Sequence, residues 1–211
     1  RDVGRIMSAA THLTGDLDVI AEEAGLRLRR KRHEDALDDY AWKRDPELAR
    51  FDARPPLTAG FSAYLADFER ELLFADPSRC EFALEADDRL HIGNVMYYHG
   101  DHVAGSAELG LTIGRPDFRG RGLGRRATTL FLRYAWTNLP FRLIYLHTLE
   151  WNERARACFR AAGFEEVARV LRGEDVFVRM EVRREWWLMW EMEGRFRPEH
   201  GESAPPTGPA P

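Results

Sequence analysis

The sequence contains, at residues 117–127, the stretch DFRGRGLGRRA, which lies between a predicted strand and a predicted helix. Residues 107–113 alternate in polarity, which predicts a strand, and apolar residues at helical spacing in 127–136 predict a helix. The glycines therefore lie at the start of a helix, where unpaired N–H groups and a partial positive charge favour an anion. Since glycine has no Cβ, the backbone can approach a ligand closely. We expect a phosphate-binding turn, surrounded by four arginines.

The spacing of the glycines separates this turn from two other phosphate motifs. A Walker loop ends in Gly-Lys-Ser/Thr, which this stretch lacks, and the dinucleotide fingerprint G-x-G-x-x-G fails here at its third glycine. Arg119, Gly122 and Gly124 instead form Arg-x-x-Gly-x-Gly. This pattern resembles the pyrophosphate-binding signature of the GNAT acetyltransferases, which bind acetyl-coenzyme A. The alternative is an ordinary glycine-rich turn with an exposed basic cluster.

Residues 152–164 carry a second resemblance. Asn152 is a natural N-cap for a helix over 152–162, and Gly163 suits the C-terminal end of that helix. The run Asn-x-x-Ala, followed by Phe159 and then Gly163-Phe164, also resembles the GNAT helix that packs against the thioester end of the coenzyme. The segment from Trp42 through Asp45-Pro46-Glu47-Leu48 resembles a landmark of the Rim-type ribosomal-protein N-acetyltransferases.

The chain divides into three predicted parts. Residues 1–24 are an extension, partly helical around 16–23; residues 25–186 are the GNAT domain; residues 187–211 are an apolar segment followed by a disordered Pro/Gly-rich tail from Arg197. The remaining predicted elements are strands at 26–29, 80–85, 91–98, 141–148, 167–171 and 176–183, helices at 34–42, from 46, and 58–74, a turn at 87–88 and a loop at 99–102.

Composition limits the function classes. The formal net charge is −4, so the chain as a whole does not resemble an electrostatic nucleic-acid binder, although the single run 119–122 keeps that alternative open. The two cysteines, Cys80 and Cys158, are compatible with a reducing cytosol. No long apolar run or signal-peptide pattern is present, so we expect a cytoplasmic protein without a membrane partner. The chain begins at Arg1, and whether Met7 is the natural start stays open.

The resemblance implies an α/β (α+β) fold: a mostly antiparallel twisted sheet with helices on both faces. Two parallel strands, 107–113 and 141–148, would splay apart and hold the pantetheine arm of acetyl-CoA. Backbone groups near Leu111 and Ile113 would bind that arm, because they would otherwise lack partners. No metal is implied. The residues expected to bind the coenzyme are Leu111, Ile113, Arg119, Gly120, Arg121, Gly122, Leu123, Gly124, Asn152 and Phe159.

The implied reaction is attack of a primary amine on a thioester, which needs a proton acceptor for the amine. Glu108 is the first candidate for this base, with a solvated or ion-paired glutamate as the alternative. His147 is a weaker candidate, more typical of a structural histidine. His99 and His102 are expected to be surface-loop histidines. Phe159 occupies the position where many GNAT enzymes have a tyrosine that protonates the leaving sulfur, so the general acid is undetermined. Tyr97, Tyr98 and Tyr145 could also reach the site, and the alternative is that each is a packing or surface residue.

The sequence thus predicts an acetyl-CoA-dependent N-acetyltransferase whose acceptor is a protein or peptide N-terminus. A small amine, such as a polyamine or aminoglycoside, is the first alternative, and a non-catalytic coenzyme-A-binding domain is the second. Glu150 and Trp151 could line the cleft. Trp186 is expected to end the last strand. The apolar residues that follow it are expected to be buried within the domain, to cover the acceptor cleft or to form a homodimer contact.

Overall fold

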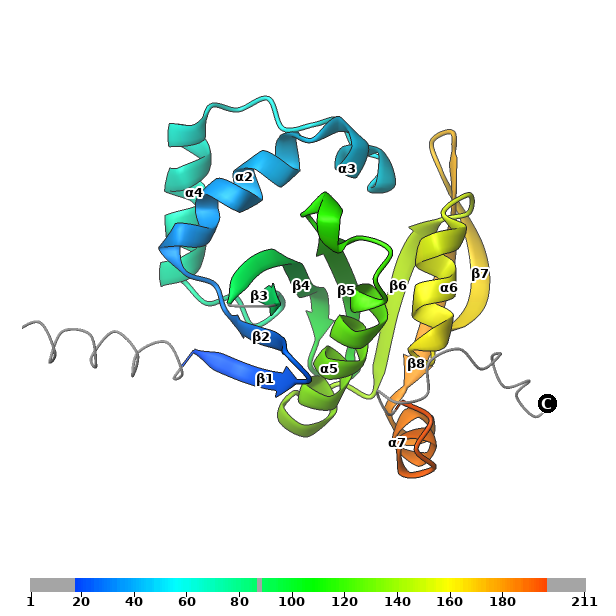
Figure 1. The fold of residues 1–211 in the computed structure, drawn as a ribbon. Helices are drawn as coiled ribbons and strands as arrows, with labels where there is room; N and C mark the ends of the chain where they lie inside the picture. The colour runs from blue at the N-terminus through cyan, green and yellow to red at the C-terminus, as the bar shows by residue number, and fades with distance from the viewer. Residues whose placement is uncertain (1–17, 87–88, 197–211) are drawn as a thin grey trace, which may run out of the picture.

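The computed structural model describes residues 18–86 and 89–196. Within these residues, eight strands form one sheet in the order β1-β2-β3-β4-β5-β6-β8-β7 (Figure 1). Neighbouring strands are antiparallel except β5 and β6, which are parallel. The bounds are β1 Val19–Glu23, β2 Leu26–Arg30, β3 Cys80–Ala86, β4 Leu90–Asp101, β5 Ser106–Ile113, β6 Leu143–Leu149, β7 Glu165–Arg172 and β8 Asp175–Arg183. The predicted fold class is confirmed.

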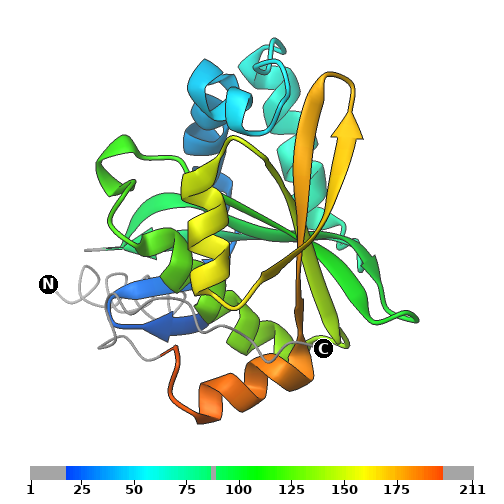
Figure 2. The ribbon, with the colours of Figure 1, turned by 90° about the vertical axis from the view of Figure 1, so that its right-hand side faces the viewer.

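Helices lie on both faces of the sheet (Figures 1 and 2). The α2, α3 and α4 helices lie on one side, and α5 and α6 lie on the other, where they contact each other. The bounds are η1 His33–Asp35, α2 Ala36–Arg44, α3 Pro46–Phe51, α4 Phe61–Leu73, η2 Pro116–Phe118, α5 Leu123–Asn138, α6 Glu153–Ala161 and α7 Arg184–Met192. The α5 helix connects the parallel pair, as a parallel pair requires.

The hydrophobic core lies between the sheet and α5. Alternate residues of the strands, such as Leu28, Leu84 and Ile144, are fully buried there, together with Phe131 and Trp136 of α5. Period-two alternation in the strands and period-3.6 spacing in the helix place these side chains on facing surfaces. The other face of the sheet then receives the alternate, more polar residues.

That second face carries a buried ionic network under η1 and α2. The guanidinium of Arg29 donates two hydrogen bonds of 2.8 Å to Asp35 and pairs with Glu85, and the three side chains are almost fully buried. Burial alone would raise the pKa of Asp35, but the hydrogen bond from Arg29 and the charge of Lys31 lower it below 3.8. Charge pairing therefore helps to anchor η1 and α2 on the sheet.

The N-terminal part differs from prediction. A helix was expected around 16–23, but the described residues of this segment form β1, which pairs with β2. Ala24 and Gly25 join the two strands with positive φ angles of 48° and 78°, a combination typical of a tight hairpin turn. Pairing with β2 overrides the local preference of residues 18–23, and the sheet begins before the expected domain start at Gly25.

The C-terminal aromatic segment lies in α7, which begins at Arg184, so Trp186 is part of a helix instead of ending β8. Trp187 is fully buried, stacks on Phe196 at a centroid distance of 4.8 Å, and donates its indole N–H to the carbonyl of Ala162. Trp186, Met189 and Met192 are exposed. The segment therefore covers the core with one face only. The expected tail from Arg197 and the turn at 87–88 lie outside the described residues.

None of the described helices is both long enough and apolar enough to span a bilayer.

Candidate functional site

The parallel strands β5 and β6 pair only at their beginnings. The register joins Ser106 to Leu143, Ala107 to Ile144 and Glu108 to Tyr145, although β5 continues to Ile113. Figure 1 shows the two strands diverging beyond this point. Backbone groups of β5 that face β6 after Glu108 therefore have no ladder partner on that strand, as expected for a splayed pair.

The glycine-rich turn (residues 119–124) leads from η2 into α5. Gly120 and Gly122 have φ angles of +75° and +72°, and a Cβ at either position would meet no protein atom within 4 Å. Gly122 is the N-cap of α5, no side chain caps the helix, and its first turn contains no acidic residue. The N–H groups of Leu123 and Gly124 begin the helix and have no intrahelical acceptor. This open, unobstructed helix start suits an anion.

Two of the four arginines around the turn, Arg119 and Arg121, are less available than the sequence suggests. Arg119 donates to the carbonyls of Ile113 at 3.0 Å and Gly114 at 2.7 Å, and pairs with Glu47 at 2.8 Å. The guanidinium of Arg121 lies 5.1 Å from the ring centre of Phe118. The side chain of Arg119 therefore fixes the end of β5, and the backbone of the turn is left to face an anion. The carbonyl of Ile113, expected to face the coenzyme, already accepts from Arg119.

The predicted Rim-type landmark packs against the same place. Gly114 has no room for a side chain, since a Cβ there would lie 2.0 Å from the ring of Trp42. The Trp42 ring also lies 4.7 Å from the ring of His91. Asp45 caps α3 by accepting from the N–H of Glu47 at 2.8 Å. The landmark thus joins α2 and α3 to the end of β5.

Glu108 lies on β5 at the last paired position before the strands separate. Its Oε1 lies 2.7 Å from His147 Nδ1, and its Oε2 lies 3.1 Å from His99 Nδ1. Glu108 is 4% exposed. The side chain of His147 is 7% exposed and that of His99 is 70% exposed. A buried carboxylate therefore links a buried imidazole to an exposed one.

The electrostatics of this group favour an ionised Glu108. Burial opposes the charge, but hydrogen bonds from His147 and His99 outweigh it and lower the pKa of Glu108 below 4.5. Burial, followed by the charge of Glu108, raises the pKa of both Tyr98 and Tyr145. The two phenols therefore remain protonated at neutral pH. Tyr97 instead packs in the core against Phe141 at 5.2 Å.

The expected loop at 99–102 is mostly the end of β4. His99 has a φ of 52° where the register between β4 and β5 shifts. This irregularity accompanies the hydrogen bond from His99 to Glu108. Both His99 and His102 are exposed, as expected, but His99 is held by Glu108 and His102 contacts the carbonyl of Pro77. Sequence reasoning missed the pairing of Glu108 with His147. The register supplies the missing signal. Tyr145 pairs with Glu108, and His147 follows Tyr145 by two residues, so the side chains of His147 and Tyr145 lie on the same face of the sheet.

The two residues of the α6 region that were predicted to bind the coenzyme, Asn152 and Phe159, contact other residues of the protein. The side-chain oxygen of Asn152 accepts from the N–H of Ala155 at 3.2 Å, which confirms the N-cap. Phe159 is buried in the core with its ring 5.8 Å from that of Phe164. Cys158 approaches the glycine-rich turn, because its Sγ would lie 3.1 Å from a Cβ on Gly124. Burial raises the pKa of this thiol to about 12. Coenzyme contacts by Asn152 and Phe159 stay predictions.

The residues after β6 meet α3 above the diverging strands. Trp151 is half-exposed, and its ring lies 5.7 Å from that of Phe51 at the end of α3. Arg50 lies 4.9 Å from the ring of Trp151, and Glu150 pairs with Arg169. Aromatic contacts therefore connect α3 to the β6–α6 loop, and a position of Trp151 in the acceptor cleft stays a prediction.

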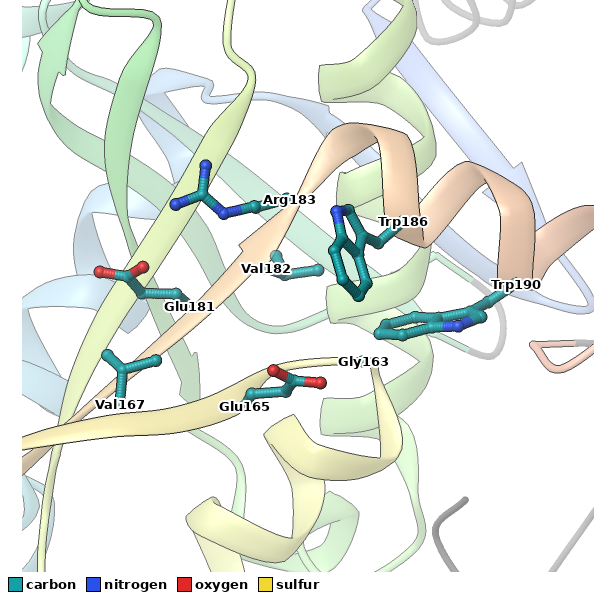
Figure 3. Close-up of a pocket in the computed structure, with 8 residues that line it drawn as sticks. All are labelled: Gly163, Glu165, Val167, Glu181, Val182, Arg183, Trp186 and Trp190. Atoms are coloured by element: carbon teal, nitrogen blue, oxygen red, sulfur yellow. The ribbon is translucent and has the colours of Figure 1, made fainter. Parts of the chain in front are cut away.

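A pocket of about 210 Å³ lies between α7 and the β7–β8 hairpin. Figure 3 shows the indoles of Trp186 and Trp190 beside the carboxylate of Glu165. None of the predicted catalytic or coenzyme-binding residues lines it; the lining residues are Gly163, Glu165, Val167, Glu181, Val182, Arg183, Trp186 and Trp190. Among the described residues, no group of three His, Cys, Asp or Glu side chains could hold a metal ion.

Part of this chain resembles known spermidine N(1)-acetyltransferases in sequence. It is 34% identical over 89 residues to spermidine N(1)-acetyltransferase of Escherichia coli K12, a match covering 42% of this chain and 47% of that protein. The protein of Escherichia coli O157:H7 matches with the same values. The match thus spans about half the length of these relatives.

Solved structures show the same fold. Spermidine N-acetyltransferase from Vibrio cholerae, in complex with CoA and spermine, superposes with a TM-score of 0.71 at 22% identity, covering 79% of this chain and 99% of that one. The dodecameric structure of spermidine N-acetyltransferase from Vibrio cholerae in an intermediate state gives 0.65 at 21% identity, covering 79% and 98%. The family model described as "Acetyltransferase (GNAT) domain" matches residues 25–165, which is most of the chain. The chain therefore belongs to the GNAT acetyltransferase family.

Proposed function

We propose that this protein is an N-acetyltransferase that moves an acetyl group from acetyl-CoA to a primary amine. The observation that carries the proposal is the position of the glycine-rich turn relative to Glu108. The turn follows β5, and Glu108 lies on β5 where that strand parts from β6. One strand would then hold the coenzyme along its free edge and the amine at its paired end.

The residues present fit the coenzyme. The start of α5 offers N–H groups without a side-chain cap, and positive φ at Gly120 and Gly122 keeps side chains away from that approach. Leu111 lies on β5 beyond the last pairing with β6, where the edge of the strand that faces β6 is available to an amide of the pantetheine arm. Holding thioester and amine on adjoining parts of one strand would supply much of the rate through orientation.

A polyamine is the acceptor that we favour. The relatives named above are spermidine N-acetyltransferases, and the ionised Glu108 with a net charge of −4 suits a cationic acceptor. Acetylation of a protein N-terminus is the second candidate. It rests on the Rim-type landmark from Trp42 to Leu48, whose residues in this fold hold α3 against β5.

The test is release of free thiol from acetyl-CoA with spermidine, spermine, or short peptides with free N-termini, together with calorimetric titration of CoA. We expect CoA to bind and thiol release to require a polyamine. Release only with peptides would move the acceptor to protein N-termini. CoA binding without release from any acceptor would favour the non-catalytic alternative, and absence of CoA binding would contradict the proposal.

A cytoplasmic location and an oligomeric assembly are part of the proposal. Both cysteines are free, in keeping with a reducing compartment. Exposed Trp186, Met189 and Met192 on α7 offer apolar surface for contact with a second copy. Size-exclusion chromatography with light scattering would measure the assembly.

A further inference from the structure

Glu108 is poorly suited to take a proton itself. Both of its carboxylate oxygens accept hydrogen bonds from imidazoles, at 2.7 Å from His147 and 3.1 Å from His99. These bonds stabilise the ionised form and hold the pKa of Glu108 below its ordinary value despite burial. A general base works best when its pKa lies near the working pH. The carboxylate is therefore better placed to orient another group.

His147 is the group that it orients. An ionised carboxylate can only accept, so Nδ1 of His147 must carry the hydrogen in their 2.7 Å bond. The other ring nitrogen, Nε2, then carries a lone pair when the imidazole is neutral. His147 lies on the part of β6 beyond its last pairing with β5, and its side chain is almost fully buried. A fixed tautomer at the separation of the strands is the arrangement that a proton acceptor needs.

His99 does not offer the same arrangement. Its side chain is 70% exposed, against 7% for His147. It reaches Glu108 from the irregular end of β4, on the far side of the carboxylate from β6. We assign it a supporting part, as a second donor that helps to keep Glu108 ionised.

The charged and titratable groups around His147 come from neighbouring strands. Arg179 of β8 lies opposite His147 in the register, where it pairs with Glu181 at 2.8 Å and lies 3.9 Å from the ring centre of Tyr145. The Tyr145 ring lies 5.8 Å from that of His147, and Arg172 acts on this tyrosine from β7. With Arg179 paired to Glu181, Glu108 is the carboxylate in direct contact with His147.

We propose that His147 takes the proton from the acceptor amine and that Glu108 is its positioning residue; this rests on the proposed acetyl transfer. The lone pair of the neutral amine forms a C–N bond to the thioester carbonyl while Nε2 of His147 accepts a proton from the amine nitrogen. The C–S bond then breaks with its electron pair on sulfur. The imidazolium returns the proton to that thiolate, which gives the amide, free coenzyme thiol and a neutral His147.

This order of proton transfers is also compatible with a phenylalanine at position 159. A phenylalanine has no proton to give, and its ring is buried in the core. A single imidazole that alternates between base and acid removes the need for a tyrosine at that position. A thiolate is in any case an acceptable leaving group, because the ordinary thiol pKa is about 8.5.

The activity test compares His147→Gln with Glu108→Gln in thiol release from acetyl-CoA with spermidine across pH 5–9. We expect His147→Gln to lower kcat/KM by roughly 10²- to 10⁴-fold and to abolish the acidic limb of the pH profile. In Glu108→Gln the acidic limb should persist in the remaining activity, because His147 is still present to accept the proton, while kcat/KM falls because the imidazole loses the carboxylate that orients it. His102→Gln, at an exposed histidine, is the control. A limb that survives in His147→Gln and vanishes in Glu108→Gln would make Glu108 the base and overturn the proposal.

A second measurement does not depend on turnover. Nitrogen-15 NMR of the imidazoles in the full chain should show the neutral His147 ring carrying its hydrogen on Nδ1, and Glu108→Gln should change this tautomer preference, whereas His102→Gln should not. An Nε2–H tautomer in the wild type, or a tautomer preference that Glu108→Gln leaves unchanged, would overturn the pairing. If spermidine and peptides are all inert while this signature is present, the proposed function fails and the His147–Glu108 pair stands.

Discussion

Replacement of Gly122 by alanine tests the predicted phosphate site, because its effect on protein stability can be measured separately from its effect on CoA binding. Gly122 has a φ of +72°, and a Cβ there meets no protein atom within 4 Å. The cost to folding is therefore backbone strain alone, about 1–2 kcal/mol for an L-residue in the left-handed region. For a chain of this size that corresponds to a fall in Tm of roughly 2–8 °C. Urea and thermal unfolding measure this part of the effect.

The effect on coenzyme binding should be larger and has another cause. The methyl group would project into the open space before the start of α5, where we place the pyrophosphate. Loss of one charge-assisted hydrogen bond from the turn costs about 1.5–3 kcal/mol, which weakens the Kd for CoA roughly ten- to 150-fold. Isothermal titration calorimetry with CoA measures it directly.

Gly173 provides the matched control. It lies in the turn between β7 and β8 with a φ of +62°, and a Cβ there also meets nothing within 4 Å. Gly173→Ala should lose the same 1–2 kcal/mol of stability through the same strain and leave the Kd for CoA unchanged. If Gly122→Ala and Gly173→Ala bind CoA equally well, the glycine-rich turn is not the phosphate site and the reasoning fails.

Three further predictions follow from local contacts. Gly114→Ala should destabilise the protein by about 1–3 kcal/mol in urea, because its Cβ would collide with the Trp42 ring; unchanged stability would contradict that packing. Asn152→Ala should cost about 1 kcal/mol through loss of the α6 cap, and an equal unfolding midpoint would contradict the cap. Asp35 has a pKa below 3.8, so it contributes stability above pH 4 that is lost as the pH falls through its folded-state pKa. Asp35→Asn should lose about 3–5 kcal/mol at pH 7, since Arg29 stays buried with one partner fewer, and should flatten the acid limb of stability; an acid limb as steep as in the wild type would refute this.

Local sequence signals were sufficient for most of the fold. Alternation predicted β5 and β8, helical spacing predicted α5, and Asp45-Pro46 correctly marked the start of α3. The failures occurred where distant partners decide the structure. Residues 19–23 have weak local preference and become a strand because β2 offers a neighbour. Trp186 enters a helix because Trp187 must reach the core at Ala162.

The candidate site was predictable in its parts but not in its pairing. The glycine-rich turn and Glu108 could be identified from the order of strand, turn and helix. His147 seemed a structural histidine, because its contact with Glu108 depends on the parallel register of β5 and β6, whose paired residues, such as Glu108 and Tyr145, are 37 residues apart in the sequence. No local pattern carries that register. The hydrogen bond between His147 and Glu108, on which our proposed mechanism rests, is thus a property of the topology.

The same dependence on topology changes the interpretation of Arg119. In the sequence it reads as a phosphate ligand, since it opens the pattern Arg-x-x-Gly-x-Gly. In the fold its guanidinium is occupied by the carbonyls of Ile113 and Gly114 and by Glu47 of α3. The arginine therefore fixes the direction in which the turn leaves β5, and Trp42 in the space above Gly114 fixes α2 against the same point. The segment from Trp42 to Leu48 and the glycine-rich turn, which are separate motifs in the sequence, thus meet in one place. Their contacts position the uncapped start of α5. We propose that the turn offers a phosphate the backbone N–H groups of this helix start, because the guanidinium of Arg119 is already occupied and that of Arg121 lies against Phe118.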